Sequence, residues 1–447
     1  MTRLPSLSGT IITMSNPQPL AAILTLGCKL NLADSEEIAR ALRARGFAVV
    51  DRLCEADAYV INTCSVTHVA DRKSRRLVRS VRRLAPGATV AVTGCFPQSA
   101  GFEAAEALGA DFVTGTRDTD KAALVTFLAA RARTQSSELR TQNSDTHPSR
   151  HARAFIKAQE GCNDVCAFCI VPRTRGREES RGIDRVIAEV NDAVDRGAQE
   201  AVITGTQLGV WGRDFDSELK PHHLIAGILE ETDVARLRFS SLQPQDITPE
   251  LLGLWSDPRL MPHFHLALQS GSEDILALMR RRYTAREFIE AASRIRAVVP
   301  DAAITTDVIA GFPGETGAHF AETLALCEEV GFARIHAFPY SQRVRTTAAR
   351  MANQVASDVR KERTAALMTL GDQLSRRFRQ RFVDTVRPVL WESVARTAEG
   401  GHWSGHTDNY IEVIAEGDEL RNRITPVRLN ALYDGGMTGS IVSGVSP

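Results

Sequence analysis

Three cysteines stand within eight residues in the stretch Gly161-Cys162-Asn163-Asp164-Val165-Cys166-Ala167-Phe168-Cys169-Ile170-Val171-Pro172. Gaps of three and then two residues form a tight loop that can turn three thiolates toward one point, as in cysteine runs that hold iron–sulfur clusters. Three ligands leave one iron of a cubane cluster open, which indicates chemistry there. A structural zinc site, the alternative, needs a fourth Cys or His nearby, and the nearest histidine, His151, lies upstream of a predicted strand.

Around this loop, apolar runs alternate with amphipathic helical patterns. Strands are predicted at residues 154–158, 201–205, 236–241, 263–268, 303–312 and 333–340, and helices at 183–198, 285–299 and 316–330. This alternation is typical of right-handed βαβ units, and six units make an incomplete barrel. Ligands of such barrels bind at the carboxyl ends of the strands. The candidate cofactor-binding residues at those ends are Thr204, Gly205, Ser270 and Asp307.

Upstream, an apolar run that ends in a cysteine and leads into a helical pattern occurs three times, at residues 22–28, 58–64 and 88–95. The carboxyl ends of strands in a doubly wound parallel sheet lie along one edge, where ligands bind. We therefore predict that Cys28, Cys64 and Cys95 meet and hold a second cluster. Buried cysteines also suit strand ends for packing alone. Cys54 and Cys327 lack this context and are interpreted as packing residues.

The helical pattern between Cys64 and Cys95 carries a basic stripe. Its arginines fall within an arc of about 100°, whereas Leu77, Val78, Val81 and Leu84 face the other way; the stripe comprises Arg72, Arg75, Arg76, Arg79 and Arg83. A solvated helix face is the simpler interpretation. Because no acidic residue stands between Arg72 and Arg83, phosphate binding competes with it.

Length and composition bound the rest. The chain has 447 residues, eight cysteines, and 54 basic against 54 acidic residues, so nucleic-acid binding would depend on local patches. No apolar run reaches membrane-spanning length and no secretion signal is evident, which favours a cytoplasmic protein with no membrane contact. The predicted organisation is a disordered extension at 1–19, an α/β domain at 20–130, a linker at 131–150, the barrel at 151–382 and a final domain at 383–447.

The final domain shows short alternating runs separated by glycine-rich turns. This texture predicts a small antiparallel β-barrel of the kind that often binds nucleic acid. Trp403 and Tyr410 are candidates for stacking on bases, with a core position favoured for Trp403.

From about Leu24 to Val442 the chain resembles the radical S-adenosylmethionine methylthiotransferases. The motifs that carry the resemblance are the three-cysteine loop, Leu26-Gly27-Cys28-Lys29-Leu30-Asn31, Asn62-Thr63-Cys64-Ser65-Val66-Thr67, Thr93-Gly94-Cys95, Leu268-Gln269-Ser270-Gly271-Ser272, Gly311-Phe312-Pro313-Gly314-Glu315-Thr316 and Pro339-Tyr340-Ser341. Cys28-Lys29-x-Asn31 and Phe155-Ile156-Lys157 are most similar to the branch that modifies threonylcarbamoyladenosine at position 37 of tRNA.

The resemblance implies two [4Fe–4S] clusters, one on Cys28, Cys64 and Cys95 and one on Cys162, Cys166 and Cys169, with S-adenosylmethionine at the open iron of the second. It also implies a C-terminal TRAM domain that grips RNA, a tRNA anticodon arm as partner, an external electron donor, and a methylthio group added to C2 of the adenine. Rival hypotheses are isopentenyladenosine-37 or a ribosomal protein side chain as substrate, and, in another class, a non-catalytic iron–sulfur RNA-binding redox sensor.

Three positions depart from the family pattern. Gln243 stands where Glu is usual, Arg173 where an aromatic residue commonly follows the proline, and Val344-Arg345 where Pro-Gly is usual. None of them is a predicted cluster ligand. They bear on details of the substrate site and leave the reaction class unaffected.

Overall fold

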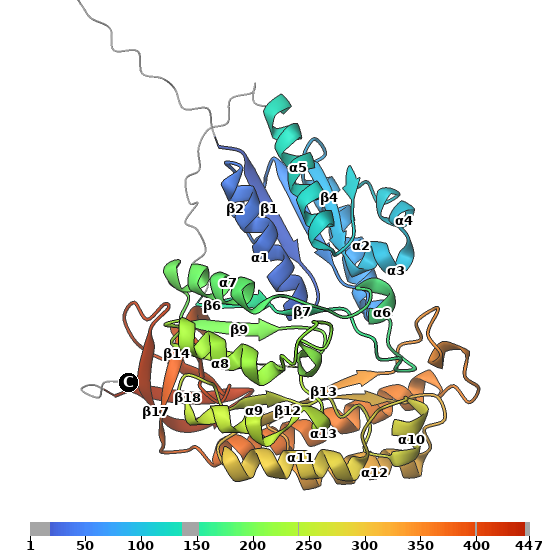
Figure 1. Cartoon of the computed structure of the whole chain (residues 1–447), viewed down its shortest axis with the longest axis vertical. Helices are drawn as coiled ribbons and strands as arrows, with labels where there is room; N and C mark the ends of the chain where they lie inside the picture. The colour runs from blue at the N-terminus through green and yellow to red at the C-terminus, as the bar shows by residue number, and fades with distance from the viewer. Residues whose placement is uncertain (1–17, 136–151, 240, 398–399, 443–447) are drawn as a thin grey trace, which may run out of the picture.

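The computed structural model describes residues 18–135, 152–239, 241–397 and 400–442 (Figure 1). The predicted disordered extension lies almost wholly outside the described residues, as does most of the predicted linker. Helix α5 (Asp118–Gln135) continues into the first residues assigned to that linker.

The N-terminal sheet is parallel and has the strand order β2-β1-β3-β4-β5. Its strands are β1 (Leu20–Thr25), β2 (Ala48–Val50), β3 (Ala58–Thr63), β4 (Thr89–Gly94) and β5 (Phe112–Val113). Helices α1 (Lys29–Ala44) and α5 pack on one face, and α2 (His68–Leu84), α3 (Cys95–Ala100) and α4 (Phe102–Glu106) cover the other. From β1, the next strand in sequence, β2, is added on one side of the sheet, and β3, β4 and β5 are added on the other. This change of side between β1 and β3 is a topological switch point, where sheets of this kind bind ligands.

Six parallel strands form the second unit, beneath the first in Figure 1. They are β6 (Arg153–Lys157), β9 (Glu200–Thr204), β10 (Arg236–Phe239), β11 (His263–His265), β12 (Ala303–Ala310) and β13 (Arg334–Pro339). Parallel bridges from Leu237 to Leu260 and from Leu242 to Leu266 join the first three strands to the last three. The predicted incomplete (βα)6 barrel is confirmed.

Helices surround this barrel because apolar side chains on one side of each helix meet the outward face of the strands. They are α7 (Ile183–Asp195), α8 (Pro221–Glu231), α9 (Pro249–Gly253), α10 (Glu273–Leu278), α11 (Ala285–Val298), α12 (Gly317–Val330) and α13 (Ser357–Gln380). Shorter elements are β7 (Gln159–Glu160), α6 (Val171–Thr174), β8 (Glu179–Ser180) and the turns η1 (Leu208–Val210), η2 (Pro244–Asp246), η3 (Leu254–Ser256) and η4 (Ala348–Arg350). Among the described helices, none has the length and apolarity needed to cross a membrane.

The last unit is a closed barrel with the order β14-β15-β16-β18-β17. Its strands are β14 (Val386–Thr397), β15 (Gly400–Thr407), β16 (Glu412–Ala415), β17 (Ile424–Tyr433) and β18 (Gly436–Ile441). The predicted antiparallel barrel is confirmed except for one pair, since β16 and β18 run parallel. Its core includes Val389, Trp391 and Val427. Phe378 of α13 packs against this core, as does Phe382, which follows the helix.

The two aromatic residues proposed for base stacking both lie in packed positions. The Tyr410 ring stacks on His263 at 4.7 Å and on His406 at 4.8 Å between ring centroids, and the Arg238 guanidinium lies 4.7 Å from its centre. Tyr410 therefore joins the closed barrel to the (βα)6 barrel and is not free to stack on a base. Trp403 is partly buried against the barrel core, in agreement with the core position that the sequence favoured. Its indole N–H donates to the Gly417 carbonyl at 2.9 Å.

Candidate active site with two cysteine triads

The three closely spaced cysteines of the loop lie between β7 and α6 and are here named the loop triad; they are Cys162, Cys166 and Cys169. The turn that starts the loop requires glycine at Gly161. That residue has a φ of +69°, and a Cβ there would lie 1.9 Å from the carbonyl oxygen of Arg177. The Cys162 amide donates to the Gly176 carbonyl at 3.2 Å, which closes the loop back on the chain that follows.

The loop triad lines a cavity of about 630 Å³, whose wall also contains Arg173, Arg177, Arg280 and Arg345. Burial raises the pKa of Cys162 to about 11 and that of Cys169 to about 12. Burial in an apolar setting disfavours thiolates, and a metal supplies the positive charge that deprotonates them. Three thiols at the wall of a cavity of this size are therefore suited to bind a cluster as its ligands.

Side chains behind the triad are also connected to it. The Cys162 thiol lies 3.5 Å from Gln207 Oε1, and Arg281 Nη1 donates to Cys166 Sγ at 3.3 Å. Gln243 accepts from Arg281 Nη2 at 3.1 Å and its amide nitrogen lies 3.5 Å from Asp164 Oδ2. A glutamate at position 243 would place a second carboxylate against Asp164, so the neutral amide suits this chain.

The other two departures from the family pattern lie beside each other in the same cavity wall. Arg345 has a φ of +75°, a backbone conformation that favours the glycine usual at this position. Its carbonyl accepts a hydrogen bond from Arg173 Nε at 3.1 Å. The two residues together add positive charge to the wall beside the loop triad.

The other three predicted ligands, Cys28, Cys64 and Cys95, are here named the strand-end triad. They follow β1, β3 and β4 and lie at the switch point of the sheet. Gly94 has a φ of +98°, and a Cβ there would lie 2.3 Å from the Thr63 carbonyl oxygen, so only glycine lets these two strand ends approach. The structure brings the three cysteines together, Cys64 and Cys95 buried and Cys28 exposed.

Two asparagines tie the strand ends to one another. Asn31 donates to Asn62 Oδ1 at 3.0 Å and to the Thr63 carbonyl at 2.9 Å, while Asn62 donates to the Asn31 carbonyl at 2.8 Å. Burial raises the pKa of Cys95 to about 12, and the neighbouring Cys28 and Cys64 act in the same direction. These sulfurs are thus within electrostatic reach of each other.

A single metal ion is a poor fit for either triad. Within the portion of the chain described, no three or more His, Cys, Asp and Glu side chains converge closely enough to hold one ion. The thiolates of a cubane cluster bind different irons and stand farther apart than the ligands of a zinc ion.

The predicted cofactor-binding residues differ in where they point. A Cβ on Gly205 would lie 2.7 Å from Leu208 Cδ2, so this glycine serves close packing, and Thr204 is buried at the end of β9. The Ser270 hydroxyl lies 3.3 Å from Thr323 Oγ1 of α12 and faces the helix layer. Asp307 is the one of the four that faces the barrel lumen with its side chain one-third exposed.

Sequence analysis missed the polar partners of Asp307. His265 Nε2 lies 3.4 Å from Asp307 Oδ2, and His336 is paired with Asp307 across β12 and β13. Lys29, at the start of α1, is within electrostatic reach of Asp307. Burial lowers the pKa of Lys29 to about 8, and Arg238 and Arg153 act in the same direction, while Glu200 and Asp307 act in the opposite direction. The alternation of polar residues along a predicted barrel strand, as at His263 and His265, could have predicted that these side chains share one face of the strand.

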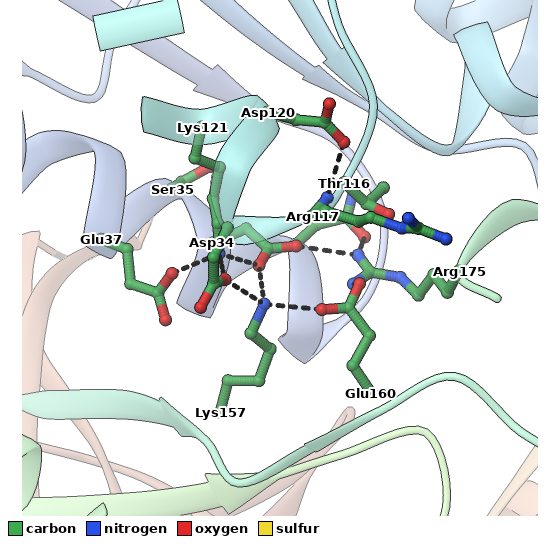
Figure 2. Close-up of polar contacts among 12 residues, drawn as sticks. Asp34, Ser35, Glu37, Thr116, Arg117, Asp120, Lys121, Lys157, Glu160 and Arg175 are labelled. Carbon is green, nitrogen blue, oxygen red and sulfur yellow. Dashed lines mark hydrogen bonds and ion pairs between the residues drawn. The ribbon is translucent and has the colours of Figure 1, made fainter. Parts of the chain in front are cut away.

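A largely buried ion-pair network connects α1 and α5 to Lys157, Glu160 and Arg175 (Figure 2). Asp34 of α1 is at its centre, bound by Lys121 Nζ at 3.1 Å, Lys157 Nζ at 2.9 Å and Arg175 at 3.0 Å. Burial alone would raise the pKa of Asp34, but these three cations hold it below its usual range. Glu160 pairs with both Lys157 and Arg175. The network connects the N-terminal sheet to the segments that flank the loop triad.

The basic stripe of α2 forms a surface hollow of about 630 Å³, here named the arginine groove. It is lined by Arg72, Arg75, Arg76, Arg79, Arg82, Arg83 and Leu108. Arg82 is fixed by the Gly109 carbonyl and Asp111, whereas the other five form no ion pair with a described acidic residue. Leu84, predicted to face inward, is 44% exposed because it lies in the last turn of the helix.

Known families match two segments. Residues 21–115 match Uncharacterized protein family UPF0004, and residues 156–327 match the Radical SAM superfamily. The Threonylcarbamoyladenosine tRNA methylthiotransferase MtaB of Bacillus subtilis is 36% identical over 91% of this chain and 93% of its own. The MtaB of Thermotoga maritima is 33% identical over 93% and 95%.

The chain belongs to the radical S-adenosylmethionine methylthiotransferase family. It is therefore an enzyme that transfers a methylthio group, and a non-catalytic redox sensor is no longer a competing hypothesis. The cofactors of methylthiotransferases of this family, S-adenosylmethionine and two [4Fe–4S] clusters, are those of this chain.

Relatives with a second activity are nearly as similar, and solved structures agree on the fold. The tRNA-2-methylthio-N(6)-dimethylallyladenosine synthase of Syntrophobacter fumaroxidans is 33% identical over 94% of this chain and 95% of its own. The structure of the radical S-adenosylmethionine methyltransferase TsrM from Kitasatospora setae, with cobalamin and a [4Fe–4S] cluster bound, superposes with a TM-score of 0.52 at 14% identity, covering 72% of each chain.

Proposed function

We propose that this methylthiotransferase modifies C2 of N6-threonylcarbamoyladenosine at position 37 of tRNA. The observation that carries the proposal is the polar lumen of the barrel, where Lys29, His265 and His336 surround Asp307. The threonylcarbamoyl group ends in a carboxylate, and burying that charge requires a cation or amide donors to offset lost hydration. An isopentenyl group would need apolar walls in the same place.

A tRNA substrate is supported by two surfaces as well as by the names of the relatives. The arginine groove offers positive charge without acidic partners among the described residues, which suits a phosphate backbone. The closed C-terminal barrel supports the proposal of a TRAM domain, which the resemblance implies and which would grip RNA. Position 37 lies in the single-stranded anticodon loop, so its base can enter a barrel without the opening of a duplex.

For the two clusters we propose the ligands predicted from sequence, the loop triad for the cluster that binds S-adenosylmethionine and the strand-end triad for the auxiliary cluster. When bound and reduced by an external electron donor, the clusters supply radical and sulfur chemistry that the protein alone lacks. The protein's own part is orientation. Asp307 faces the lumen and is proposed as a polar contact, while Thr204, Gly205 and Ser270 are proposed to support the strand ends from which the cofactor is bound.

Purified, anaerobically reconstituted protein tests the substrate. We expect it to convert an anticodon arm that carries threonylcarbamoyladenosine and to leave isopentenyladenosine arms and the ribosomal protein unmodified. The methyl ester of threonylcarbamoyladenosine isolates the carboxylate, because it keeps the shape of the substituent and removes its charge. Conversion of an isopentenyladenosine arm at a comparable rate would overturn the substrate and leave the family intact.

The Lys29→Met variant tests the cation directly. A charged hydrogen bond contributes on the order of 1.5–3 kcal/mol, so kcat/KM for the carboxylate substrate should fall roughly ten- to hundredfold. The methyl ester should be converted equally by the variant and the parent. Lys361→Met, on the exposed side of α13, is the matched control. Iron content measured on both variants separates a lost contact from a lost cluster, since Lys29 adjoins Cys28.

A second candidate substrate, dimethylallyladenosine, is favoured only by the similarity of relatives such as the Syntrophobacter fumaroxidans enzyme. The polar side chains of Lys29, His265 and His336 around Asp307 suit a charged substituent better than this apolar one. It is the competing outcome of the same assay.

A further inference from the structure

Two buried arginines from the (βα)6 barrel reach the strand-end triad from different sides. Arg175 follows α6 and so stands six residues after Cys169 of the loop triad. Arg343 follows β13, two residues before Arg345 in the cavity wall of the loop triad. Each arginine therefore connects the surroundings of one triad to the other.

Arg175 makes two of its contacts on α1, the helix that follows Cys28, and a third on β7. Its Nη2 donates to Asn31 Oδ1 and to Asp34 Oδ2, both at 3.0 Å, and its Nη1 donates to Glu160 Oε1 at 2.9 Å. The Cys28 thiol lies 3.4 Å from the same Asn31 Oδ1. Figure 2 shows Arg175 beside Asp34 and Glu160.

Arg343 holds the remaining side of the triad without facing a cysteine. Its Nη2 donates to Ser65 Oγ at 2.8 Å and to Ser99 Oγ at 3.0 Å, and its Nη1 pairs with Asp71 at 2.7 Å. Ser65 follows Cys64, and Ser99 lies on the helix that begins at Cys95. Arg343 thus fixes the chain around the triad, whereas Arg175 shares its acceptor, Asn31 Oδ1, with the Cys28 thiol.

We propose that Arg175 donates N–H groups to the sulfur side of the auxiliary cluster and raises its reduction potential, and that Arg343 only seats the loops around that cluster. The inference rests on the strand-end triad holding the cluster, as proposed above. A cluster gains negative charge on reduction, so a nearby cation and N–H donors favour the reduced state. Arg175 is suited to this role because its side chain is only 2% exposed, and little water screens its charge.

Arg175 also links the two cluster sites through the chain. Only α6 separates it from Cys169, and Asp34 and Glu160 hold its guanidinium in place. Because these carboxylates are also bound by Lys157, which extends from β6 of the barrel, the position of the donor depends on both units being seated together.

The test isolates the auxiliary cluster in the full chain. In a Cys162→Ala, Cys166→Ala, Cys169→Ala background, reconstituted anaerobically, the midpoint potential is measured by redox titration with EPR detection. We expect Arg175→Gln to shift it to more negative values, Arg175→Lys to shift it less because the charge is kept, and Arg343→Gln, the matched control, to leave it at the parent value.

Arg175→Gln leaves Asp34 and Glu160 short of a partner and can impair folding, so Arg175→Lys is the variant that keeps the experiment decisive. Equal potentials in the parent and in Arg175→Lys and Arg175→Gln proteins that hold about four irons each would overturn the proposal. An equal shift in Arg343→Gln would also overturn it, since seating alone would then explain the effect. Absence of iron from the background protein would instead reject the ligand assignment on which the inference rests.

Discussion

The two cysteine triads reach similar arrangements by opposite routes. The loop triad is made within residues 162–169, so its geometry depends on one turn and on Gly161. The strand-end triad collects residues 28, 64 and 95 from three strands and exists only when β1, β3 and β4 are paired in register. One site is therefore a local property of the chain and the other is a property of a folded sheet. Residue spacing therefore identifies the first kind of site, and sheet topology identifies the second.

Removing either triad should have the largest effect and should show that the two are independent. Wild-type protein reconstituted anaerobically should bind roughly eight irons, because each cluster contains four. The Cys162→Ala, Cys166→Ala, Cys169→Ala variant and the Cys28→Ala, Cys64→Ala, Cys95→Ala variant should each bind roughly four. Iron and sulfide analysis with EPR checks this. Zinc in place of iron, or a single cluster in the wild type, would contradict it.

A pair of glycine substitutions separates the triads without touching a cysteine. Gly94→Ala brings a Cβ to 2.3 Å from the Thr63 carbonyl oxygen and should remove only the strand-end cluster. Gly161→Ala brings a Cβ to 1.9 Å from the Arg177 carbonyl oxygen and should remove only the loop cluster. Neither backbone atom can move without shifting its own strand or turn, and each positive φ adds strain of about 1–3 kcal/mol.

The matched control is Gly253→Ala. Gly253 has a φ of −58° and nothing lies within 4 Å of the position its Cβ would take, so iron binding should stay at the wild-type level. Loss of both clusters from Gly94→Ala would mean that the loop triad also depends on the sheet, and the contrast between local and assembled sites would fail.

Much of this architecture follows from the sequence, for reasons that the triads make plain. Apolar residues recur with a period of two in strands and 3.6 in helices, so many of the barrel strands and helices could be predicted. One example is the strand predicted at 303–312 and observed at Ala303–Ala310. Cys28, Cys64 and Cys95 could be grouped because parallel strands of one sheet end at one edge. The three cysteines of the loop needed only their spacing.

What sequence could not supply is contact between residues far apart that share no pattern. Arg175, Asp34 and Lys157 are ordinary charged residues until the two units meet and bury them. Tyr410 looked available for a base because its stacking partners, His263 and Arg238, come from another unit. Lys29 comes within electrostatic reach of Asp307 only because α1 is seated on the barrel. In each of these three cases the missed contact lies between two units.

The arginine groove belongs to the strand-end side of the comparison, since α2 begins four residues after Cys64. Changing Arg75, Arg76 and Arg79 to Ala should weaken tRNA binding across sequences and flatten its dependence on salt, by about one unit of log–log slope per lost phosphate contact. Titrations at several salt concentrations measure both quantities. Iron content should not change, because none of these arginines contacts a cysteine in the described structure.

The control for the groove is Arg286→Ala with Arg294→Ala on α11. Both arginines project from a helix on the outside of the barrel. These changes remove surface charge without entering the groove, so the salt slope should stay at the wild-type value. An unchanged slope in the groove variant as well would return the stripe to the role of a solvated helix face.

A smaller effect is expected at Glu36, where helix α1 of the sheet unit contacts strand β6 of the barrel. Glu36 lies on α1, which follows Cys28, and accepts a hydrogen bond at 3.2 Å from the amide of Phe155 on β6, the strand that leads to the loop triad. Burial raises its pKa to about 7, although the Phe155 amide and Arg40 act in the opposite direction. The folded protein therefore prefers the neutral carboxyl, whereas the unfolded chain ionises near pH 4.5.

For a carboxyl whose pKa is raised by folding, stability is highest when the group is protonated in both states and is lost as pH rises from about 4.5 to about 7. Glu36→Gln keeps a neutral acceptor for the Phe155 amide and removes this loss. The stability advantage of the variant should grow between pH 5 and pH 8 by on the order of 2 kcal/mol and then level off. Urea unfolding at several pH values measures it, with the exposed Glu106→Gln on α4 as the control that should show no such trend. If the stability difference between Glu36→Gln and the parent stays constant across this pH range, then water reaches Glu36 in the folded protein. The contact between α1 and β6 would then be less tightly packed than the interiors of the sheet and the barrel.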